Sequence, residues 1–207
     1  GEDLENEYFF IIDEINRGDI SKIFGELFYA VDPGYRGKNG KVKTQYANLI
    51  SKDDPYYGGF YIPENVYIIG TMNDIDRSVE SMDFAIRRRF TWKEIKAEDR
   101  ISMWDGKIDA QKDDAAKRMK ALNDEISKTD SLSDAFHVGP AYFLKLSEYD
   151  GNFDTLWDLH IQPLLKEYLR GTVDPEKELD RFKKAYNLQG ADNKPENSES
   201  APTASQE

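Results

Sequence analysis

Two apolar runs in the first part of the chain each lead into polar residues. Phe9–Ile12 is followed directly by Asp13 and Glu14, and Val66–Gly70 is followed three positions later by Asn73. Neither run alternates between apolar and polar side chains, so each predicts a strand buried on both faces, as in parallel sheets covered by helices. Parallel strands end at one edge of a sheet, so we expect Asp13, Glu14 and Asn73 to lie close together there.

The segments around these runs predict a helix and a hairpin. Asp19 can cap a helix whose apolar side chains form one stripe from Ile20 to Val31, at spacings of three and four residues. A polar, tyrosine-rich stretch then lies between Val42–Ile50 and Phe60–Ile62. This pattern predicts a β-hairpin insert, with a disordered surface loop as the alternative.

The next segments predict a short helix at Ser78–Arg88 and a third strand at Phe90–Ile95, which together give an α/β fold class. Beyond Lys96 the sequence becomes charged and predicts helices, over residues 112–127, 152–170 and 176–187. Pro163 should kink or split the second of them. We therefore expect an α/β core at 1–96 and a helical subdomain at 97–188. Residues 189–207 lack large apolar side chains and predict a disordered tail.

Charge and composition narrow the function classes. The net charge is −12, from 40 acidic and 28 basic residues, which argues against a large nucleic-acid-binding face, so we expect any DNA contact to come from regions outside this chain. The absence of cysteine excludes disulfides and thiolate metal sites and fits a cytoplasmic protein. The sequence contains no apolar stretch of membrane-spanning length, so no membrane association is expected.

Candidate chemistry gathers at the predicted carboxyl ends of the strands. Asp13 and Glu14 can hold Mg²⁺ and orient water there, although a strand that simply ends in solvated acids before a helix fits the residues equally well. Arg87, Arg88 and Arg89 follow this candidate site, where guanidinium groups can stabilise negative charge on a phosphoryl group. Three adjacent arginines are more often a solvated face.

Three motifs in one order carry a family resemblance. They are DEINR at residues 13–17, IIGTMNDIDRS at 68–78 and RRRF at 87–90. Together they resemble the McrB family, AAA+ motor subunits of bacterial systems that restrict modified DNA. The resemblance implies a partial P-loop NTPase (AAA+) parallel sheet core followed by an α-helical lid. It also implies Mg²⁺ and GTP or ATP as cofactors, with GTP favoured, a homo-oligomeric ring, and a nuclease partner subunit of the McrC type.

The resemblance also assigns roles by position. It implies that Asp13 of the Walker B motif holds Mg²⁺, that Glu14 orients the hydrolytic water, and that Asn73 senses the γ-phosphate. Further residues are implied near the nucleotide: Asp76 and Arg77 of the family's signature, Arg87 and Arg88 as arginine fingers reaching a neighbouring subunit, and Tyr142 in the lid. Asp76 as a helix cap and Tyr142 as part of the lid core remain equally open alternatives.

The sequence departs from the family at one element. The family's phosphate-binding loop, G-x-x-x-x-G-K-[ST], is absent from the 207 residues. That loop supplies backbone amides and a lysine to the nucleotide phosphates. We therefore expect a C-terminal part of a longer motor subunit, with weak or no nucleotide binding and no activity alone. Two alternatives stay open: a degenerate, non-hydrolytic AAA+ scaffold, and a two-metal hydrolase that uses Asp13, Glu14, Asp74 and Asp76.

Overall fold

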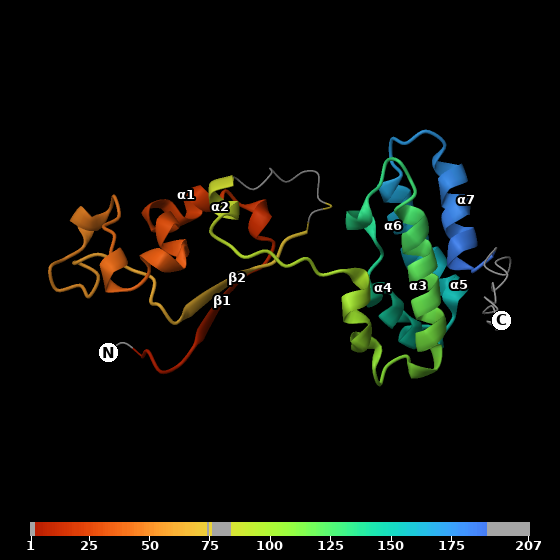
Figure 1. Ribbon diagram of the computed structural model, residues 1–207, viewed down its shortest axis with the longest axis horizontal. Coiled ribbons are helices and arrows are strands. Elements are labelled where there is room, and N and C mark those ends of the chain that lie inside the picture. The colour runs from red at the N-terminus through yellow and green to blue at the C-terminus, as the bar shows by residue number, and fades with distance from the viewer. Residues whose placement is uncertain (1–2, 74, 76–83, 190–207) are drawn as a thin grey trace, which may run out of the picture. The chain divides into compact units, whose positions relative to one another are not determined.

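The computed structural model describes residues 3–73, 75 and 84–189. The chain divides into two compact units, Gly1–Lys93 and Glu94–Glu207 (Figure 1). The first unit contains both strands, and the second is helical within its described residues. The predicted disordered tail lies outside the described part of the chain, apart from Gln189.

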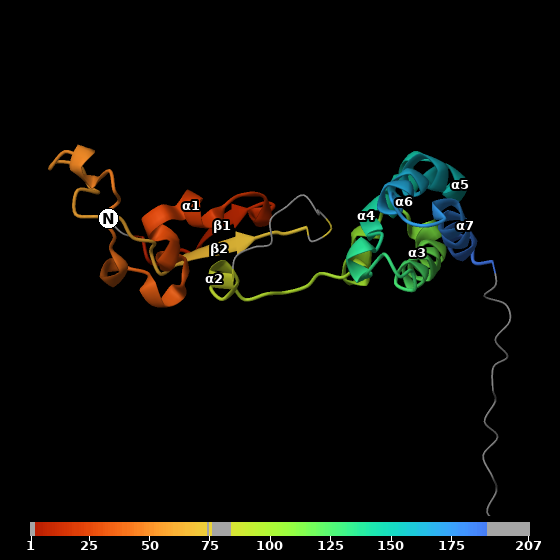
Figure 2. The ribbon, with the colours of Figure 1, turned by 90° about the horizontal axis from the view of Figure 1, so that it is seen from above.

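The two predicted strands are present and parallel. Strand β1 covers Tyr8–Ile12 and β2 covers Val66–Gly70, in a register that pairs Tyr8 with Val66 and Ile12 with Gly70. Figure 2 shows the two strands side by side, running in the same direction. The prediction that both apolar runs form adjacent parallel strands is therefore confirmed, and it places their carboxyl ends at the same edge.

The predicted burial of β1 is wrong for this chain. Phe9 and Ile11 are 59% and 65% exposed, and Tyr8 and Phe10 are also exposed. The reason is that the pair forms a two-stranded sheet with few covering side chains among the described residues. A small core, built on Ile15, Ile20 and Ile86, covers only the carboxyl-end region.

The predicted helix after β1 begins where expected but changes form. Helix α1 covers Ile20–Phe24, and the Asp19 side chain accepts a hydrogen bond from the Lys22 backbone N–H. A 3₁₀ segment, η2, then covers Gly25–Val31. Gly25 has a φ of +51°, a left-handed conformation that interrupts the regular α-helix. The apolar stripe therefore breaks, and its member Ile23 is exposed.

The predicted β-hairpin insert is present only as one isolated β-bridge. Val42 and Phe60 exchange two backbone hydrogen bonds of 2.8 Å as an isolated antiparallel bridge. A short 3₁₀ turn, η5 (Ala47–Leu49), takes the place of an extended strand, and two further turns, η3 (Pro33–Tyr35) and η4 (Lys38–Gly40), precede the bridge. The segment lies at the end of the first unit away from α2 (Figure 1).

The segment after β2 ends in a short helix, α2, at Phe84–Arg87. The rest of the helix predicted from Ser78 lies outside the described residues. The third strand predicted at Phe90–Ile95 is wrong, since no strand is assigned there. The segment instead folds back on the preceding turn, because the Trp92 indole N–H donates to the Arg87 carbonyl at 2.9 Å.

The second unit is built from α-helices and short irregular turns. The elements in order are η6 (Ala97–Trp104), η7 (Asp109–Gln111), α3 (Lys112–Ile126), η8 (Asp134–Phe136), α4 (Pro140–Phe143), η9 (Leu144–Glu148), α5 (Phe153–Leu156), η10 (Trp157–Ile161), α6 (Gln162–Tyr168) and α7 (Pro175–Tyr186). Eighteen buried side chains form one core, centred on large residues such as Trp104, Phe143 and Trp157. This core is fully enclosed within the unit.

Helices α3 and α7 lie side by side and antiparallel (Figure 1). The Arg118 guanidinium near the start of α3 bonds the Tyr186 carbonyl at 3.2 Å, and Glu125 near its end pairs with Arg181. Asn123 is buried in the same helix, where its side chain donates to the Val138 carbonyl and accepts from the Val138 N–H. This double hydrogen bond fixes the loop that precedes α4.

Pro163 divides the predicted 152–170 helix. Helix α5 passes into a π-helical turn, η10, before α6 begins at Gln162. Proline has no backbone N–H and its ring crowds the carbonyl four residues earlier, so a regular α-helix cannot continue through it. The wider π turn accommodates the break, as predicted, and keeps Trp157 and Ile161 buried.

Candidate functional site

The candidate site lies at the carboxyl ends of β1 and β2. Two backbone hydrogen bonds extend the ladder beyond the strands: the Thr71 N–H donates to Ile12 and the Ile15 N–H donates to Thr71, both at 2.9 Å. The Thr71 hydroxyl then bonds the Asp13 carboxylate and accepts from the Glu14 N–H at 3.1 Å. One side chain just after β2 thus contacts both acidic residues that follow β1.

Asn73 lies at the same edge, as the sequence predicts. Its backbone carbonyl accepts a 3.0 Å hydrogen bond from the Asn16 side-chain amide, which ties the segment after β2 to the one after β1. Its own side-chain oxygen accepts from the Ile75 N–H at 3.2 Å and supports a local turn. The Asn16 side-chain oxygen is buried and has no hydrogen-bond partner within the described part of the chain.

Glu14 is held in an uncommon conformation. Its φ and ψ are 51° and 50°, the left-handed region that costs a non-glycine residue about 1–2 kcal/mol. Its carboxylate pairs with the Arg17 Nε at 2.8 Å, and both side chains remain partly exposed to solvent. The backbone therefore turns sharply after Asp13 and leaves the Glu14 carboxylate reachable by water, the arrangement required of a group that polarises a water molecule.

The three arginines differ in their surroundings. Arg87 stacks over the Trp92 ring at 5.3 Å. Arg89 packs over the Phe28 ring at 4.3 Å and donates to the Ala85 carbonyl, so it stabilises the fold of the first unit. Arg88 is exposed, and its guanidinium has no hydrogen bond or ion pair with any described residue. Of the three, Arg88 is the most available for a partner outside the chain.

For three of the predicted site residues, the described structure gives no position relative to this edge. Asp76 and Arg77 lie outside the described residues, as does Asp74 of the two-metal alternative. Tyr142 belongs to the second unit, where it is partly buried against the helical core. Among the described residues, no group of three or more His, Cys, Asp or Glu side chains could hold a metal ion.

The structure adds three residues that the sequence reasoning did not single out, namely Thr71, Asn16 and Arg17. Thr71 bridges the two acids, Asn16 ties the two segments, and Arg17 pairs with Glu14. Their positions carried a usable signal, because each lies within five residues of a strand end, where polar side chains gather in parallel sheets. Within the described ranges, no helix has the length and apolar character needed to cross a membrane.

Two family models match successive parts of the chain. Residues 2–90 match a model described as an AAA domain of the dynein-related subfamily, and residues 114–177 match the alpha-helical lid domain of McrB. The first match falls within the first compact unit and the second match within the second unit. The small parallel sheet and the helical unit therefore correspond to an AAA domain segment and a lid.

Two curated proteins are similar in sequence. The Type IV methyl-directed restriction enzyme EcoKMcrB subunit of Escherichia coli (strain K12) is 38% identical over 179 residues, covering 81% of this chain and 38% of that protein. The Type II restriction enzyme BsuMI component YdiS of Bacillus subtilis (strain 168) is 29% identical over 101 residues, covering 46% and 29%. The chain thus spans about a third of the length of each relative. It belongs to the McrB-like AAA proteins and joins part of the AAA domain to the McrB lid.

Proposed function

We propose that this chain is the part of a ring-forming NTPase that supplies the hydrolytic edge of its nucleotide site. The observation that carries the proposal is the meeting of two segments at one sheet edge: the Thr71 hydroxyl bonds Asp13 and Glu14, and the Asn16 amide bonds the Asn73 carbonyl. Two acids that only end a strand in solvent would not need these hydrogen bonds. The family match to an AAA domain supports nucleotide binding as the general activity.

The oxygen donors at this edge fit Mg²⁺. The Asp13 carboxylate is exposed, the Thr71 hydroxyl lies against it, and the Asn16 side-chain oxygen has no partner among the described residues. Mg²⁺ prefers such oxygen ligands and takes its remaining ligands from water and substrate phosphates. When bound, the ion would neutralise charge on the β- and γ-phosphates.

The side chains divide the remaining work. Glu14 polarises the attacking water and accepts its proton, and Asn73 orients the water against the γ-phosphate. Arg88, or Arg87, reaches the nucleotide of a neighbouring subunit and stabilises charge in the transition state. Asp76, Arg77 and Tyr142 remain candidates for nucleotide contacts. Because the 207 residues contain no phosphate-binding loop, nucleotide binding by this chain alone is weak.

The wider setting is inferred from the relatives. One is named as a methyl-directed restriction subunit and the other as a component of a restriction enzyme. We therefore propose that the native protein acts in the cytoplasm, as a homo-oligomeric ring that couples hydrolysis of GTP, in preference to ATP, to a nuclease partner of the McrC type. In that assembly the ring drives restriction of modified DNA.

Turnover by the native full-length protein tests the catalytic assignment. Glu14→Gln keeps the size of the side chain but removes its basicity, so we expect GTP hydrolysis to fall at least 100-fold, within the usual contribution of a general base. Glu148→Gln makes the same change at an exposed position of the second unit and should leave turnover unchanged. Unchanged hydrolysis by Glu14→Gln would refute the assignment.

The alternative function is a non-hydrolytic AAA scaffold. The missing phosphate-binding loop is the observation that favours it. Equilibrium titration of fluorescent GTP and ATP analogues with Mg²⁺ into the native protein separates the two. Saturable binding of one nucleotide supports the NTPase and identifies its base, whereas no binding of either supports the scaffold.

A further inference from the structure

Residues 36–61 form a locally basic segment in an acidic protein. This segment, called the excursion here, contains Arg36, Lys38, Lys41, Lys43 and Lys52 but only two acids. Its net charge is therefore +3, whereas the whole chain carries −12. A charge separation of this kind places a positive patch on a molecule that otherwise repels polyanions.

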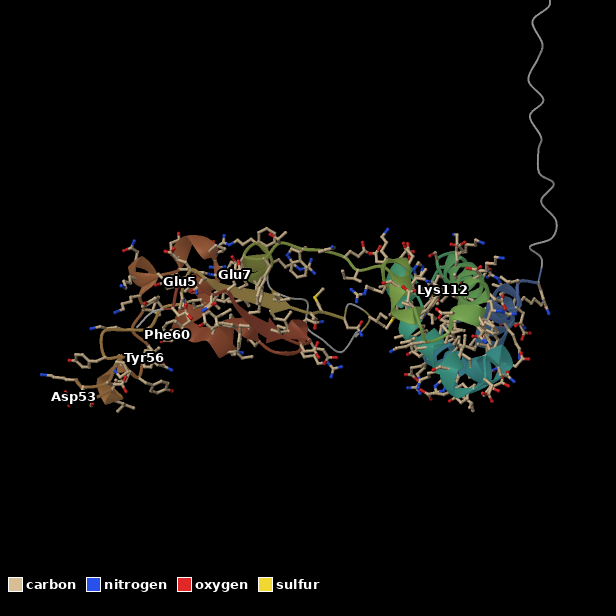
Figure 3. The ribbon with its side chains drawn as sticks, turned by 90° about the horizontal axis from the view of Figure 1, so that it is seen from below. Glu5, Glu7, Asp53, Tyr56, Phe60 and Lys112 are labelled. Atoms are coloured by element: carbon tan, nitrogen blue, oxygen red, sulfur yellow. The ribbon has the colours of Figure 1, made fainter. Side chains whose placement is uncertain are left out.

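Aromatic rings are exposed on the same segment. Tyr46, Tyr56, Tyr57 and Phe60 are 63%, 54%, 42% and 37% exposed. Tyr56 and Phe60 lie with ring centroids 5.6 Å apart, and Figure 3 shows them close together near the tip of the excursion. The Val42–Phe60 bridge and a 2.8 Å hydrogen bond from the Gly59 N–H to the Tyr56 carbonyl hold this pair in place.

Three lysines lie on the same segment as these rings. Lys41, Lys43 and Lys52 are exposed, and the Lys41 Nζ lies 5.8 Å from the centroid of the Tyr61 ring. Asp54, one of the two acids, is partly occupied by the turn, since its carboxylate accepts from the Tyr56 N–H at 2.8 Å. The excursion therefore presents cations and ring faces together, and the Glu26 carboxylate also reaches it as acceptor from the Gln45 N–H at 3.0 Å.

We propose that the excursion binds single-stranded DNA. Lysines that follow a phosphate backbone, combined with aromatic faces on which bases stack, are the features by which proteins bind single strands without reading their sequence. An acidic protein partner would use the lysines but would leave the exposed rings without a role. Duplex DNA would likewise meet only the lysines, because its bases are already stacked.

Single-strand binding by the excursion would run against the expectation, drawn from net charge, that DNA contacts lie outside this chain. A net charge of −12 describes the average over the chain and says nothing about how charge is distributed along it. The excursion does not contribute any residue of the Asp13–Thr71 site, so DNA binding and hydrolysis can be measured separately. A negative result for DNA binding would not contradict the proposed hydrolytic site, and a negative result for hydrolysis would not contradict DNA binding.

The test is fluorescence anisotropy of a labelled oligo(dT) with the full 207-residue chain at low salt. The first variant combines Lys41→Gln, Lys43→Gln and Lys52→Gln, and the second is Tyr56→Ala. The matched control combines Lys117→Gln, Lys166→Gln and Lys177→Gln, three exposed lysines of the second unit. Circular dichroism of each variant checks that its fold is unchanged.

We expect salt-dependent binding that the control retains. The first variant should reduce the slope of log K against log salt by about 2, because each neutralised phosphate contact contributes about 0.7. Tyr56→Ala should weaken binding about 10-fold through lost stacking. Absence of binding, or equal loss in the control, would overturn the proposal. So would equal binding of polyglutamate with no effect of Tyr56→Ala, which would indicate a surface for acidic proteins.

Discussion

At the scale of single residues, Thr71 joins the two halves of the candidate site. Its hydroxyl contacts the Asp13 carboxylate and accepts from the Glu14 N–H, so the rotamer of one side chain fixes the position of both acids. A site whose acids were held only by their own backbone would be less well defined. Its place directly after β2 was a signal in the sequence, but a hydroxyl after a strand has many ordinary roles, so the sequence alone does not assign this one.

Thr71→Val tests this role in the native full-length protein. Valine has the same shape but cannot bond Asp13 or Glu14, so we expect Mg²⁺-dependent nucleotide turnover to fall about 10-fold, the value of one hydrogen bond to a charged group. Thr155→Val in α5 is the control and should retain turnover. Full activity in Thr71→Val would show that the acids are positioned without the hydroxyl.

Asn123 is a second single residue on which we expect stability to depend strongly. It is 6% exposed and bonds both the N–H and the carbonyl of Val138. Asn123→Leu would leave two buried backbone groups without partners, so we expect a loss of about 2–4 kcal/mol in the free energy of unfolding. Urea denaturation measures it. Asp124→Leu, at the exposed neighbouring position, should cost less than about 1 kcal/mol.

At the scale of elements, α3 and α7 are joined by charges as well as by apolar packing. Arg181 of α7 contacts Glu125 of α3 and also pairs with Glu178 at 2.7 Å. Burial opposes ionisation of Glu125, but hydrogen bonds from Lys128 and Arg181 outweigh it and lower the pKa of this carboxyl below its usual value of 4.5. The pair therefore contributes to stability only when Glu125 is ionised.

This linkage predicts a pH dependence for the second unit. A carboxyl with a lowered folded-state pKa contributes stability above its unfolded pKa, and the contribution disappears as pH falls through the folded pKa. Wild-type protein should therefore exceed Glu125→Gln in unfolding free energy at pH 7, by about 1 kcal/mol. The difference should shrink steadily below pH 4.5. Urea titrations across this range measure it, and a difference independent of pH would contradict the assignment.

At the scale of the whole molecule, the first unit leaves its sheet largely uncovered. Phe9 and Tyr67 stack across the strands with centroids 5.4 Å apart, yet both remain exposed. Exposed apolar strands with free backbone edges favour pairing with other chains. The helical unit has no strand among its described residues, and most of its large apolar side chains are enclosed in one core.

Self-association of the isolated 207-residue chain should therefore depend on β1. The combined variant Phe9→Lys and Ile11→Lys places charges on the exposed strand, so we expect the dissociation constant for self-association to rise at least 10-fold. Sedimentation velocity over a concentration series measures it. Leu159→Lys, at an exposed apolar position of the second unit, is the control and should behave as wild type. Equal association of all three proteins would place the contact elsewhere.

The sequence predicted elements best where local pattern and tertiary packing agree. The two strands, the 112–127 helix, the break at Pro163 and the placement of Asn73 beside Asp13 all follow from periodicity and from the geometry of parallel sheets. The predictions of strands and of burial failed where they assumed a pairing strand or a covering layer that the described residues do not supply. Residues 90–95 have strand composition but no strand to pair with, and the hairpin lacks the regular turn that would fix its register. Burial of β1 failed for the same reason, because apolar composition cannot say what covers a strand.

Because Glu14 has a left-handed backbone conformation, selection for stability and selection for turnover should favour different residues at this position. Glycine adopts this conformation freely, so a library screened for thermal resistance alone should drift toward Glu14→Gly. A library screened for turnover should retain the acid in spite of its conformational cost. The residue recovered at position 14 from each library would therefore report which property the screen selected.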